Sequence, residues 1–307
     1  MTEVYIAPTT FAEFNSEPID LIKSKSFGIH RNELGRKLNE EEIVDKMQKC
    51  EGVIAGTENY CESVLSALPR LKVISRLGVG LDNIDIIVSN KKNIKVLATN
   101  SPAPAVAELV LGLILDLLRK ISLHNNQIRA GIWEKNMGSL LSGKTVGIIG
   151  LGTIGKKLVE ITKGLQLDYL AFDKFEDQRF AKENNVEYCG INELLERSDI
   201  VSIHLSLSDE TNELLDSNAL EKMKSTAILI NSSRGECVNE AALKKALDEK
   251  RIAGAGLDVY LDEPYKGCLL ECDNVITTPH IGSYAREIRI KMELEAVENL
   301  IKGLTNE

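Results

Sequence analysis

The feature that most constrains the fold of this sequence is a regular alternation of short β-branched runs with amphipathic segments. The runs GVIAG (52–56), LKVISRL (71–77) and IKVLAT (94–99) alternate with EEEIVDKMQK (40–49) and ESVLSALPR (62–70). The runs have the length and composition of strands, and the segments between them have the apolar spacing of helices. Strands joined through helices pair in parallel, with helices on both faces of the sheet. This part of the chain therefore predicts an α/β unit.

A second series of the same kind begins at residue 145. The segment around 105–130 lies between the two series and is expected to be helical. A last helical run, 285–303, follows the second series, and the pattern alone leaves it free to join either unit. The strand-like runs of the second series are TVGIIG (145–150), DYLAFD (168–173), DIVSIHL (199–205), TAILINS (226–232), AGAGLDVY (253–260) and VITTPH (275–280), with the helical segments INELLERS (191–198) and EAALKKALDE (240–249) among them.

Composition excludes several classes of function. The 307 residues carry a net charge of −9, so there is no basic field to attract a nucleic acid, and an anionic substrate must be met by a few local cations. The most apolar stretch, Val106 to Leu118, is too short to span a bilayer, and the N-terminus lacks the pattern of a secretory signal. The six cysteines are scattered, which favours reduced thiols in the cytoplasm over a metal site or disulfides. We therefore expect no membrane partner and no metal.

One glycine-rich turn matches the pattern G-x-G-x-x-G. Gly150, Gly152 and Gly155 follow the apolar strand at 145–149 and open a helical segment. In such a turn the glycines allow a tight bend, a close approach of a pyrophosphate and close helix packing. Asp173 ends the next strand, where a carboxylate accepts both ribose hydroxyls of NAD and repels the 2′-phosphate of NADP. A glycine-rich turn with an incidental aspartate is the alternative, and the context on both sides favours an NAD site.

Three segments in the second series end in polar residues suited to catalysis. NSSRGE (231–236), GLDVYLDEP (256–264) and TPHIGS (278–283) each follow a predicted strand and supply Arg234, Glu263 and His280. Each residue alone has an ordinary explanation, as a surface ion pair, a loop charge or a core histidine. Ligands of open α/β sheets bind at the carboxyl ends of the strands, so their joint occurrence there indicates an active site.

With these motifs the sequence resembles the D-isomer-specific 2-hydroxyacid dehydrogenase family along nearly its whole length. The resemblance implies two Rossmann-like α/β domains with parallel sheets. A flavodoxin-like substrate-binding domain, 1–100, would be discontinuous and completed by 285–307, and a Rossmann NAD-binding domain would span 101–284. It also implies a homodimer formed through the Rossmann domain. The further segments that carry the resemblance are SRLGVGLDNID (75–85), PAVAEL (104–109), GIW (131–133), LSGKTVGIIGLGTIG (141–155), IVSIHL (200–205) and INSSRGECVNE (230–240).

The resemblance also implies a role for each matched residue. Arg234 would bind the substrate carboxylate and carbonyl oxygen, His280 would act as the general acid and base, and Glu263 would hold the imidazole. In the first domain, Gly78 and Val79 would offer backbone amides to the substrate carboxylate. Besides the glycine turn and Asp173, the implied cofactor contacts are Thr153, Ile154, Leu205, Ser232, Ser233 and, at the nicotinamide carboxamide, Asp258.

The substrate is less constrained than the reaction. Arg76 and Lys135 are cations near the matched substrate segments, which favours D-3-phosphoglycerate, whereas Glu58 would repel a phosphate. The alternatives are an unphosphorylated acid of the glyoxylate, hydroxypyruvate or lactate type, and a non-catalytic NAD(H)-sensing protein similar to the transcriptional corepressors on this fold. An adenosylhomocysteine hydrolase relative would need additional segments. Glu263 argues against the formate dehydrogenase branch, in which glutamine pairs with the histidine.

Overall fold

The computed structural model describes residues 1–100 and 102–305 and divides into two compact units. Unit 1 comprises Met1–Pro102 and Tyr284–Glu307, and unit 2 comprises Ala103–Ser283. The predicted boundary at residue 101 and the predicted end at 307 lie outside the described residues. Within the described part, no helix is both long and apolar enough to cross a membrane.

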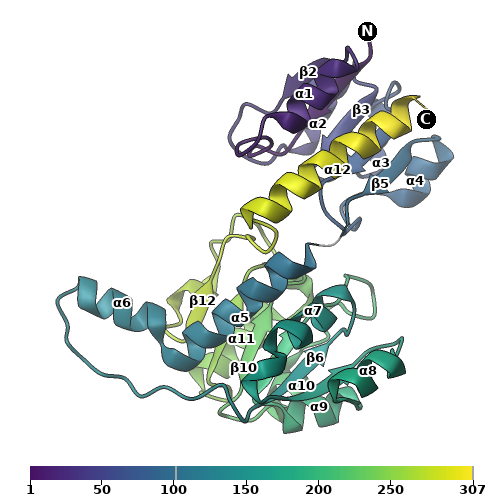
Figure 1. The fold of residues 1–307 in the computed structure, drawn as a ribbon. Helices are drawn as coiled ribbons and strands as arrows, with labels where there is room; N and C mark the ends of the chain where they lie inside the picture. Colours follow the sequence, from purple (N-terminus) through teal and green to yellow (C-terminus); the bar gives the residue numbers. More distant parts are fainter. Residues whose placement is uncertain (101, 306–307) are drawn as a thin grey trace. The chain divides into compact units, whose positions relative to one another are not determined.

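Unit 1 is built on a five-stranded parallel sheet with the order β2-β1-β3-β4-β5, the order of flavodoxin-like folds. One face packs on α2, α3 and α4 through residues such as Ile43, Leu65 and Val88. The other face packs on α1 and α12 (Figure 1). The strands are β1 (Glu3–Ile6), β2 (Gly28–Arg31), β3 (Gly52–Ala55), β4 (Val73–Arg76) and β5 (Lys95–Ala98); the helices are α1 (Glu17–Ser24), α2 (Glu40–Met47), α3 (Glu62–Ala67), α4 (Ile86–Lys91) and α12 (Arg286–Thr305).

Helix α12 comes from the far end of the chain and is a central part of this core. Val297 and Leu300 are fully buried against the sheet, and the hydroxyl of Ser75 on β4 donates to the Ala296 carbonyl at 2.7 Å. Gly303 lies so close to Val73 that a Cβ atom there would be 2.7 Å from its side chain. The last predicted helix thus belongs to the first unit, and that unit is discontinuous.

Unit 2 is built on a seven-stranded parallel sheet with the order β12-β11-β10-β9-β6-β7-β8. Helices α5 and α7 cover one face, and α9, α10 and α11 cover the other. The strands are β6 (Thr145–Ile149), β7 (Asp168–Phe172), β8 (Val186–Tyr188), β9 (Ile200–Ile203), β10 (Ile228–Asn231), β11 (Gly254–Leu257) and β12 (Val275–Thr277); the helices are α5 (Ala103–Arg119), α6 (Ile121–Arg129), α7 (Thr153–Thr162), α8 (Gln178–Asn184), α9 (Ile191–Arg197), α10 (Ser217–Lys222) and α11 (Glu240–Asp248), with short 3₁₀ turns at Lys163–Leu165, Gly235–Cys237 and Cys268–Glu271.

The strand order of unit 2 reverses between β6 and β9, which lie side by side with β7 and β8 on one flank and β10 to β12 on the other. This is the Rossmann order with one additional strand, and such folds bind ligands at the carboxyl ends of the strands beside the reversal. The predicted fold class, two Rossmann-like α/β domains with parallel sheets, is confirmed.

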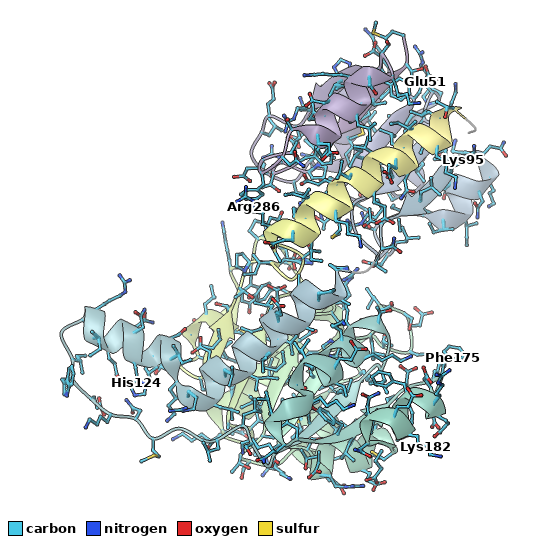
Figure 2. All side chains as sticks on the ribbon, in the orientation of Figure 1. Glu51, Lys95, His124, Phe175, Lys182 and Arg286 are labelled. Atoms are coloured by element: carbon cyan, nitrogen blue, oxygen red, sulfur yellow. The ribbon has the colours of Figure 1, made fainter. Side chains whose placement is uncertain are left out.

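One helix departs from expectation. The helical segment predicted around 105–130 is two helices, because Lys120 adopts a left-handed conformation with φ of 54° between α5 and α6. Helix α6 buries none of its residues and projects from the body of unit 2 (Figure 1). His124 on α6 (Figure 2) accepts a hydrogen bond at Nε2 from the backbone N–H of Asn136, at 2.9 Å, and so ties the following loop back to the helix.

Candidate active site

The turn between β6 and α7 has the geometry of a phosphate-binding loop. Gly150 has φ of +97°, and a Cβ atom there would lie 2.7 Å from the carbonyl oxygen of His204. A Cβ atom at Gly155 would lie 2.6 Å from the Gly150 carbonyl oxygen, whereas Gly152 has open space in front of it. The turn therefore requires glycine at two positions and leaves room for a ligand at the third.

The N-terminus of α7 presents donors to that open space. Thr153 and Ile154 are its first two residues, and no side chain caps the helix at Gly152. The first N–H groups of a helix have no partner inside the helix, and the helix dipole adds positive potential there. A pyrophosphate group fits this position.

Asp173 lies directly after β7, next to the glycine turn in the sheet. One of its carboxylate oxygens accepts the backbone N–H of Phe175 at 2.9 Å, which fixes the side chain at the strand end. Phe175 itself is strongly exposed (Figure 2). The carboxylate is thus in a position consistent with ribose recognition.

Two buried polar atoms at the ends of β9 and β10 lack partners among the described residues. They are Nδ1 of His204 and the hydroxyl oxygen of Ser232, each one residue past paired positions on neighbouring strands. The other ring nitrogen of His204 bonds to the Ser202 hydroxyl at 2.9 Å, and burial lowers the pKa of His204 to about 4. Buried polar atoms usually have a partner, so these two atoms are consistent with a ligand or water beside the glycine turn.

The remaining predicted cofactor residues lie at the same two strand ends. The side chain of Leu205 would be 3.0 Å from a Cβ atom at Gly150, so it borders the turn. Ser233 is nearly buried, and its hydroxyl donates to the side-chain oxygen of Asn231 at 2.9 Å. The turn, the strand ends and the orphaned hydroxyl together fit a dinucleotide.

Asn231 organises the loop that carries Arg234. Its side-chain oxygen also accepts the Ser233 backbone N–H at 3.0 Å, and its Nδ2 donates to the Arg234 carbonyl at 2.8 Å. The Arg234 guanidinium donates to the Ser233 carbonyl at 2.7 Å. The sequence motifs give Asn231 no role of its own, and its one signal in the sequence is that a polar residue ends an otherwise apolar strand.

His280 and Glu263 are joined by hydrogen bonds. Nδ1 of His280 lies 2.9 and 3.1 Å from the two carboxylate oxygens of Glu263. A carboxylate can only accept, so this contact places the proton on Nδ1 and leaves Nε2 to exchange a proton with a substrate. Both side chains are partly exposed, as a proton-transfer group must be.

The carboxyl ends of β10, β11 and β12 lie level with one another in the sheet. Asn231 pairs with Leu257, and Leu257 pairs with Thr277, so β10, β11 and β12 end together. Arg234 and His280 each lie three residues past those ends, on strands separated by about 10 Å through β11. Unit 2 thus brings the guanidinium, the carboxylate and the imidazole to one edge of its sheet.

Asp258 fixes the backbone of the histidine loop. It is 1% exposed, and its two oxygens accept the N–H groups of Ile281 and Gly282, each at 2.8 Å, and the Thr278 hydroxyl at 2.6 Å. Burial raises the pKa of this carboxyl, while the hydrogen bonds and the charge of His280 oppose that rise. The structure therefore gives Asp258 contacts to the loop that carries His280, in addition to its predicted contact with the nicotinamide.

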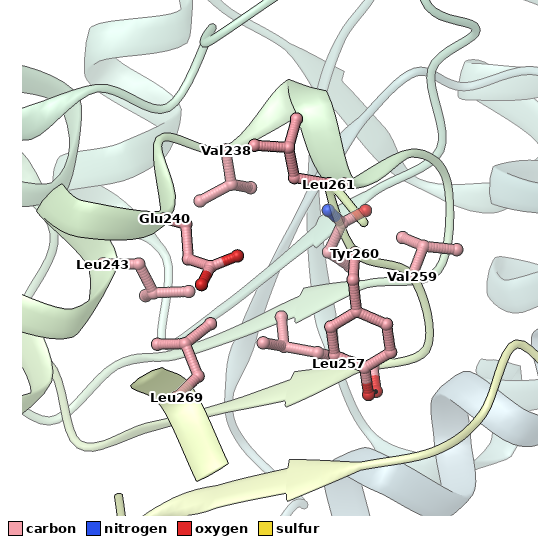
Figure 3. Close-up of a pocket in the computed structure, with 10 residues that line it drawn as sticks. Val238, Glu240, Leu243, Leu257, Val259, Tyr260, Leu261 and Leu269 are labelled. Carbon is pink, nitrogen blue, oxygen red and sulfur yellow. Dashed lines mark hydrogen bonds between the residues drawn. The ribbon is translucent and has the colours of Figure 1, made fainter. Parts of the chain in front are cut away.

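A small cavity lies beneath these loops (Figure 3). Its lining includes Gly235, Glu240, Tyr260 and Leu269, and it contains none of the predicted catalytic or cofactor residues. Tyr260 stacks on Tyr265 with ring centroids 4.3 Å apart, and the Tyr265 hydroxyl donates to Glu240 at 2.6 Å.

The predicted substrate loop belongs to unit 1. Gly78 has φ of +146°, its N–H donates to the Thr99 hydroxyl at 3.0 Å, and Val79 is 51% exposed. Arg76 is only 8% exposed; its guanidinium donates to the Gly80 carbonyl at 3.2 Å and to the Leu77 carbonyl. The guanidinium of Arg76 is therefore bonded to carbonyl groups of the loop that follows it.

Glu58 lies near Arg76 in the same unit. It is 3% exposed and accepts the Gly56 backbone N–H at 2.7 Å. Burial raises its pKa, and the positive charge of Arg76 is among the groups that oppose that rise. Among the described residues, no cluster of histidine, cysteine and acidic side chains could hold a metal ion.

Comparison with known proteins shows the family to which the chain belongs. Residues 111–282 match the family described as the NAD-binding domain of D-isomer-specific 2-hydroxyacid dehydrogenases. A glyoxylate reductase of Thermofilum pendens is 39% identical over 299 residues, which cover 93% of this chain and 85% of that protein. Among solved structures, D-lactate dehydrogenase of Aquifex aeolicus with NAD and lactic acid is 26% identical, with a TM-score of 0.86 over 99% of this chain and 96% of that one.

A further relative is longer. The D-3-phosphoglycerate dehydrogenase of Archaeoglobus fulgidus is 34% identical over 299 residues, which cover 94% of this chain. The match spans only 56% of that protein's own length. The chain therefore spans about half the length of that relative.

Proposed function

Because the chain belongs to the D-isomer-specific 2-hydroxyacid dehydrogenase family, whose members bind NAD, we propose that it interconverts a D-2-hydroxy acid and a 2-oxo acid. The observation that carries the proposal is the His280–Glu263 pair at the end of the sheet that also bears the glycine turn. NAD, when bound, accepts or supplies the hydride. The protein's own groups must then bind the acid and move one proton.

His280 is the proton-transfer group in this proposal. Glu263 holds Nδ1, so Nε2 donates a proton to the carbonyl oxygen during reduction and removes the hydroxyl proton during oxidation. The carboxylate also stabilises the imidazolium that oxidation produces. The two residues act as one unit.

Arg234 binds the substrate. Its planar guanidinium can donate to both the carboxylate and the carbonyl oxygen, which orients the acid and stabilises negative charge on the oxygen that is reduced. The hydrogen bonds of Asn231 to the Arg234 loop support this role because they fix the backbone from which the guanidinium extends.

We infer the cofactor-binding residues from the glycine turn after β6 and from the carboxyl ends of the neighbouring strands. We assign the pyrophosphate to the amides of Thr153 and Ile154 in the turn formed by Gly150, Gly152 and Gly155. We assign the ribose to Asp173. The rest of the dinucleotide would contact Leu205, Ser232, Ser233 and Asp258.

Two substrates remain candidates, each with one observation in its favour. D-3-phosphoglycerate is favoured by the relative of Archaeoglobus fulgidus, which matches 94% of this chain. An unphosphorylated acid is favoured by Arg76, which is nearly buried and donates to two carbonyls of its own loop. A phosphate bound near Arg76 would compete with those hydrogen bonds and would approach the carboxylate of Glu58.

The test is oxidation of NADH, followed at 340 nm, against phosphohydroxypyruvate, hydroxypyruvate, glyoxylate, pyruvate and branched-chain 2-oxo acids. Turnover of any of them supports the proposal, and the ratio of kcat/KM between phosphohydroxypyruvate and hydroxypyruvate decides the phosphate question. Absence of turnover across the panel, with NADH still bound, would refute it and favour an NAD(H)-sensing protein.

The proposal includes a homodimer that acts in the cytoplasm. Helix α6 and the loop after it expose large apolar side chains, including Ile128 at 55%, Trp133 at 84% and Met137 at 89%. Apolar patches of this kind mark protein–protein contacts, and this one belongs to the NAD-binding unit. The six cysteines are free thiols, as is usual in a reducing compartment.

A further inference from the structure

Tyr260 contacts Glu263 and the loop that carries His280, without belonging to the His280–Glu263 pair. Its backbone N–H donates to a carboxylate oxygen of Glu263 at 3.3 Å. Its hydroxyl lies 2.9 Å from the carbonyl oxygen of Thr278, two residues before His280, and 2.9 Å from that of Leu257, at the end of β11. One residue, through its hydroxyl and its backbone N–H, thus joins the end of β11 to the loops that carry His280 and Glu263.

The histidine loop needs such support. His280 has φ of +54°, a left-handed conformation that a residue other than glycine adopts at a cost in free energy. Its own N–H donates to the Thr278 carbonyl at 3.0 Å, so the same oxygen receives both this N–H and the Tyr260 hydroxyl. Conformations of this kind persist where the surrounding structure fixes them.

Tyr260 is itself held rigidly. It is 8% exposed, and its ring stacks on Tyr265 at an interplanar angle of 19°. Burial raises the pKa of the Tyr260 hydroxyl to about 12, so it remains a hydrogen-bond donor at neutral pH. Figure 3 shows its ring directed inward among the side chains that line the cavity.

We infer that Tyr260 is a positioning residue that holds His280 and Glu263 in the geometry for proton transfer. This inference rests on the proposed function and adds a residue to it. The hydroxyl fixes the carbonyl from which the histidine loop turns, and the backbone N–H fixes the carboxylate that orients the imidazole. The two contacts together set the direction of Nε2.

Tyr265 provides a matched control. It is a tyrosine of the same stack, and its hydroxyl also makes close hydrogen bonds, to Glu240 at 2.6 Å and from the Leu269 N–H at 3.1 Å. Neither partner belongs to the catalytic loops. Tyr260→Phe and Tyr265→Phe therefore each remove one hydroxyl and keep the stacked rings.

The experiment compares kcat, KM for the best 2-oxo acid and Kd for NADH in the wild type and both variants. We expect Tyr260→Phe to lower kcat about tenfold, with KM and Kd within about twofold of the wild type, because only proton transfer loses its alignment. Tyr265→Phe should keep kcat within about twofold. Equal losses of kcat in the two variants, or an unchanged kcat in Tyr260→Phe, would overturn the inference.

A second measurement needs no turnover. The sequence contains four histidines, so the Nδ1–H proton of His280 can be assigned by comparison with His280→Gln in a proton NMR spectrum. We expect this resonance to shift in Tyr260→Phe and to stay in place in Tyr265→Phe; an unmoved resonance in Tyr260→Phe would count against the inference. An inactive wild type would refute the proposed function, and the resonance would still test the role of Tyr260.

Discussion

Arg234 and His280 are the side chains on which the proposed chemistry depends. We expect Arg234→Ala and His280→Ala each to lower kcat/KM by about 10²- to 10⁴-fold, because one loses the substrate anchor and the other the proton-transfer group. Binding of NADH should be retained, since neither residue belongs to the glycine turn. His124→Ala, on the projecting helix α6, is the control and should remain active; near-wild-type rates in either test variant would refute the role assigned to it.

Asp173 sets the choice of cofactor in the proposal. Removal of its carboxylate should abolish the repulsion of a 2′-phosphate, so Asp173→Ala is expected to lower the preference for NADH over NADPH by at least about tenfold. The measurement is the ratio of kcat/KM for the two cofactors. Glu176→Ala, three residues further along an exposed loop, should leave the ratio unchanged. A ratio that is equal in wild type and Asp173→Ala would remove the assigned role.

His204 should make the stability of the fold depend on pH. Burial lowers its pKa from 6.5 to about 4, so between these values the unfolded chain binds a proton that the folded chain does not. The free energy of unfolding should therefore fall as pH decreases through this window, by about 1.4 kcal/mol for each pKa unit of the difference.

The test of this dependence is urea unfolding at a series of pH values. In His204→Gln, the free energy of unfolding should no longer show the part of the decrease between pH 6.5 and about 4 that His204 causes. His30→Gln, which alters an exposed histidine paired with Glu3, should keep it. Parallel curves for wild type and His204→Gln would show that His204 does not contribute.

Two glycines of the turn between β6 and α7 have different roles: Gly155 allows helix α7 to pack on the sheet, and Gly152 leaves space for the cofactor. A Cβ atom at Gly155 would lie 2.6 Å from a backbone carbonyl, whereas one at Gly152 would meet nothing within 4 Å. We expect Gly155→Ala to lower the thermal midpoint by several degrees, as helix α7 moves off the sheet. Gly152→Ala should fold normally and weaken NADH binding about tenfold or more, because the methyl group occupies the open space. Calorimetry measures the thermal midpoint, and NADH fluorescence measures binding. An equal decrease of the thermal midpoint in Gly155→Ala and Gly152→Ala would contradict these different roles.

Elements with a continuous apolar pattern were predictable, and short or exposed ones were not. The runs at β3, β4, β6, β9 and β10 are buried and β-branched, and their positions were confirmed. Strand β2 (GIHR) has no buried residue, and β8 has only three residues, so neither shows an apolar pattern from which a strand could be predicted. The break at Lys120 was missed because no glycine or proline marks it.

The candidate site was predictable where the sequence motifs place residues at strand ends. Arg234, Glu263 and His280 follow β10, β11 and β12, and Glu263 and His280 are in contact. Asn231 and Tyr260 could not be found in this way, because their significance arises from hydrogen bonds between strands that only the folded sheet brings together. Arg76 was proposed as a substrate contact from its charge, and only the structure shows that its guanidinium bonds to its own loop.

At the scale of the whole molecule, the proposed dimer can be tested with a natural probe. The sequence contains one tryptophan, Trp133, and it is 84% exposed in the single chain. Burial in a dimer would move its fluorescence emission to shorter wavelength as the protein concentration rises. Ile132→Asp should shift sedimentation to the monomer. Phe175→Asp should not, because Phe175 is as exposed as Trp133 but lies in the segment after β7. Concentration-independent emission together with monomeric sedimentation would refute the dimer.

The position of α12 has a consequence for the order in which the chain acquires its structure during synthesis. Residues 1–102 leave the ribosome first, yet the face of their sheet that contains Val73 is covered by a helix that begins at Arg286. The intervening unit, Ala103–Ser283, has its own cores and can fold as soon as it has been made. Residues 1–102 are therefore translated before unit 2 but completed after it, and the apolar face of their sheet stays open until α12 has emerged.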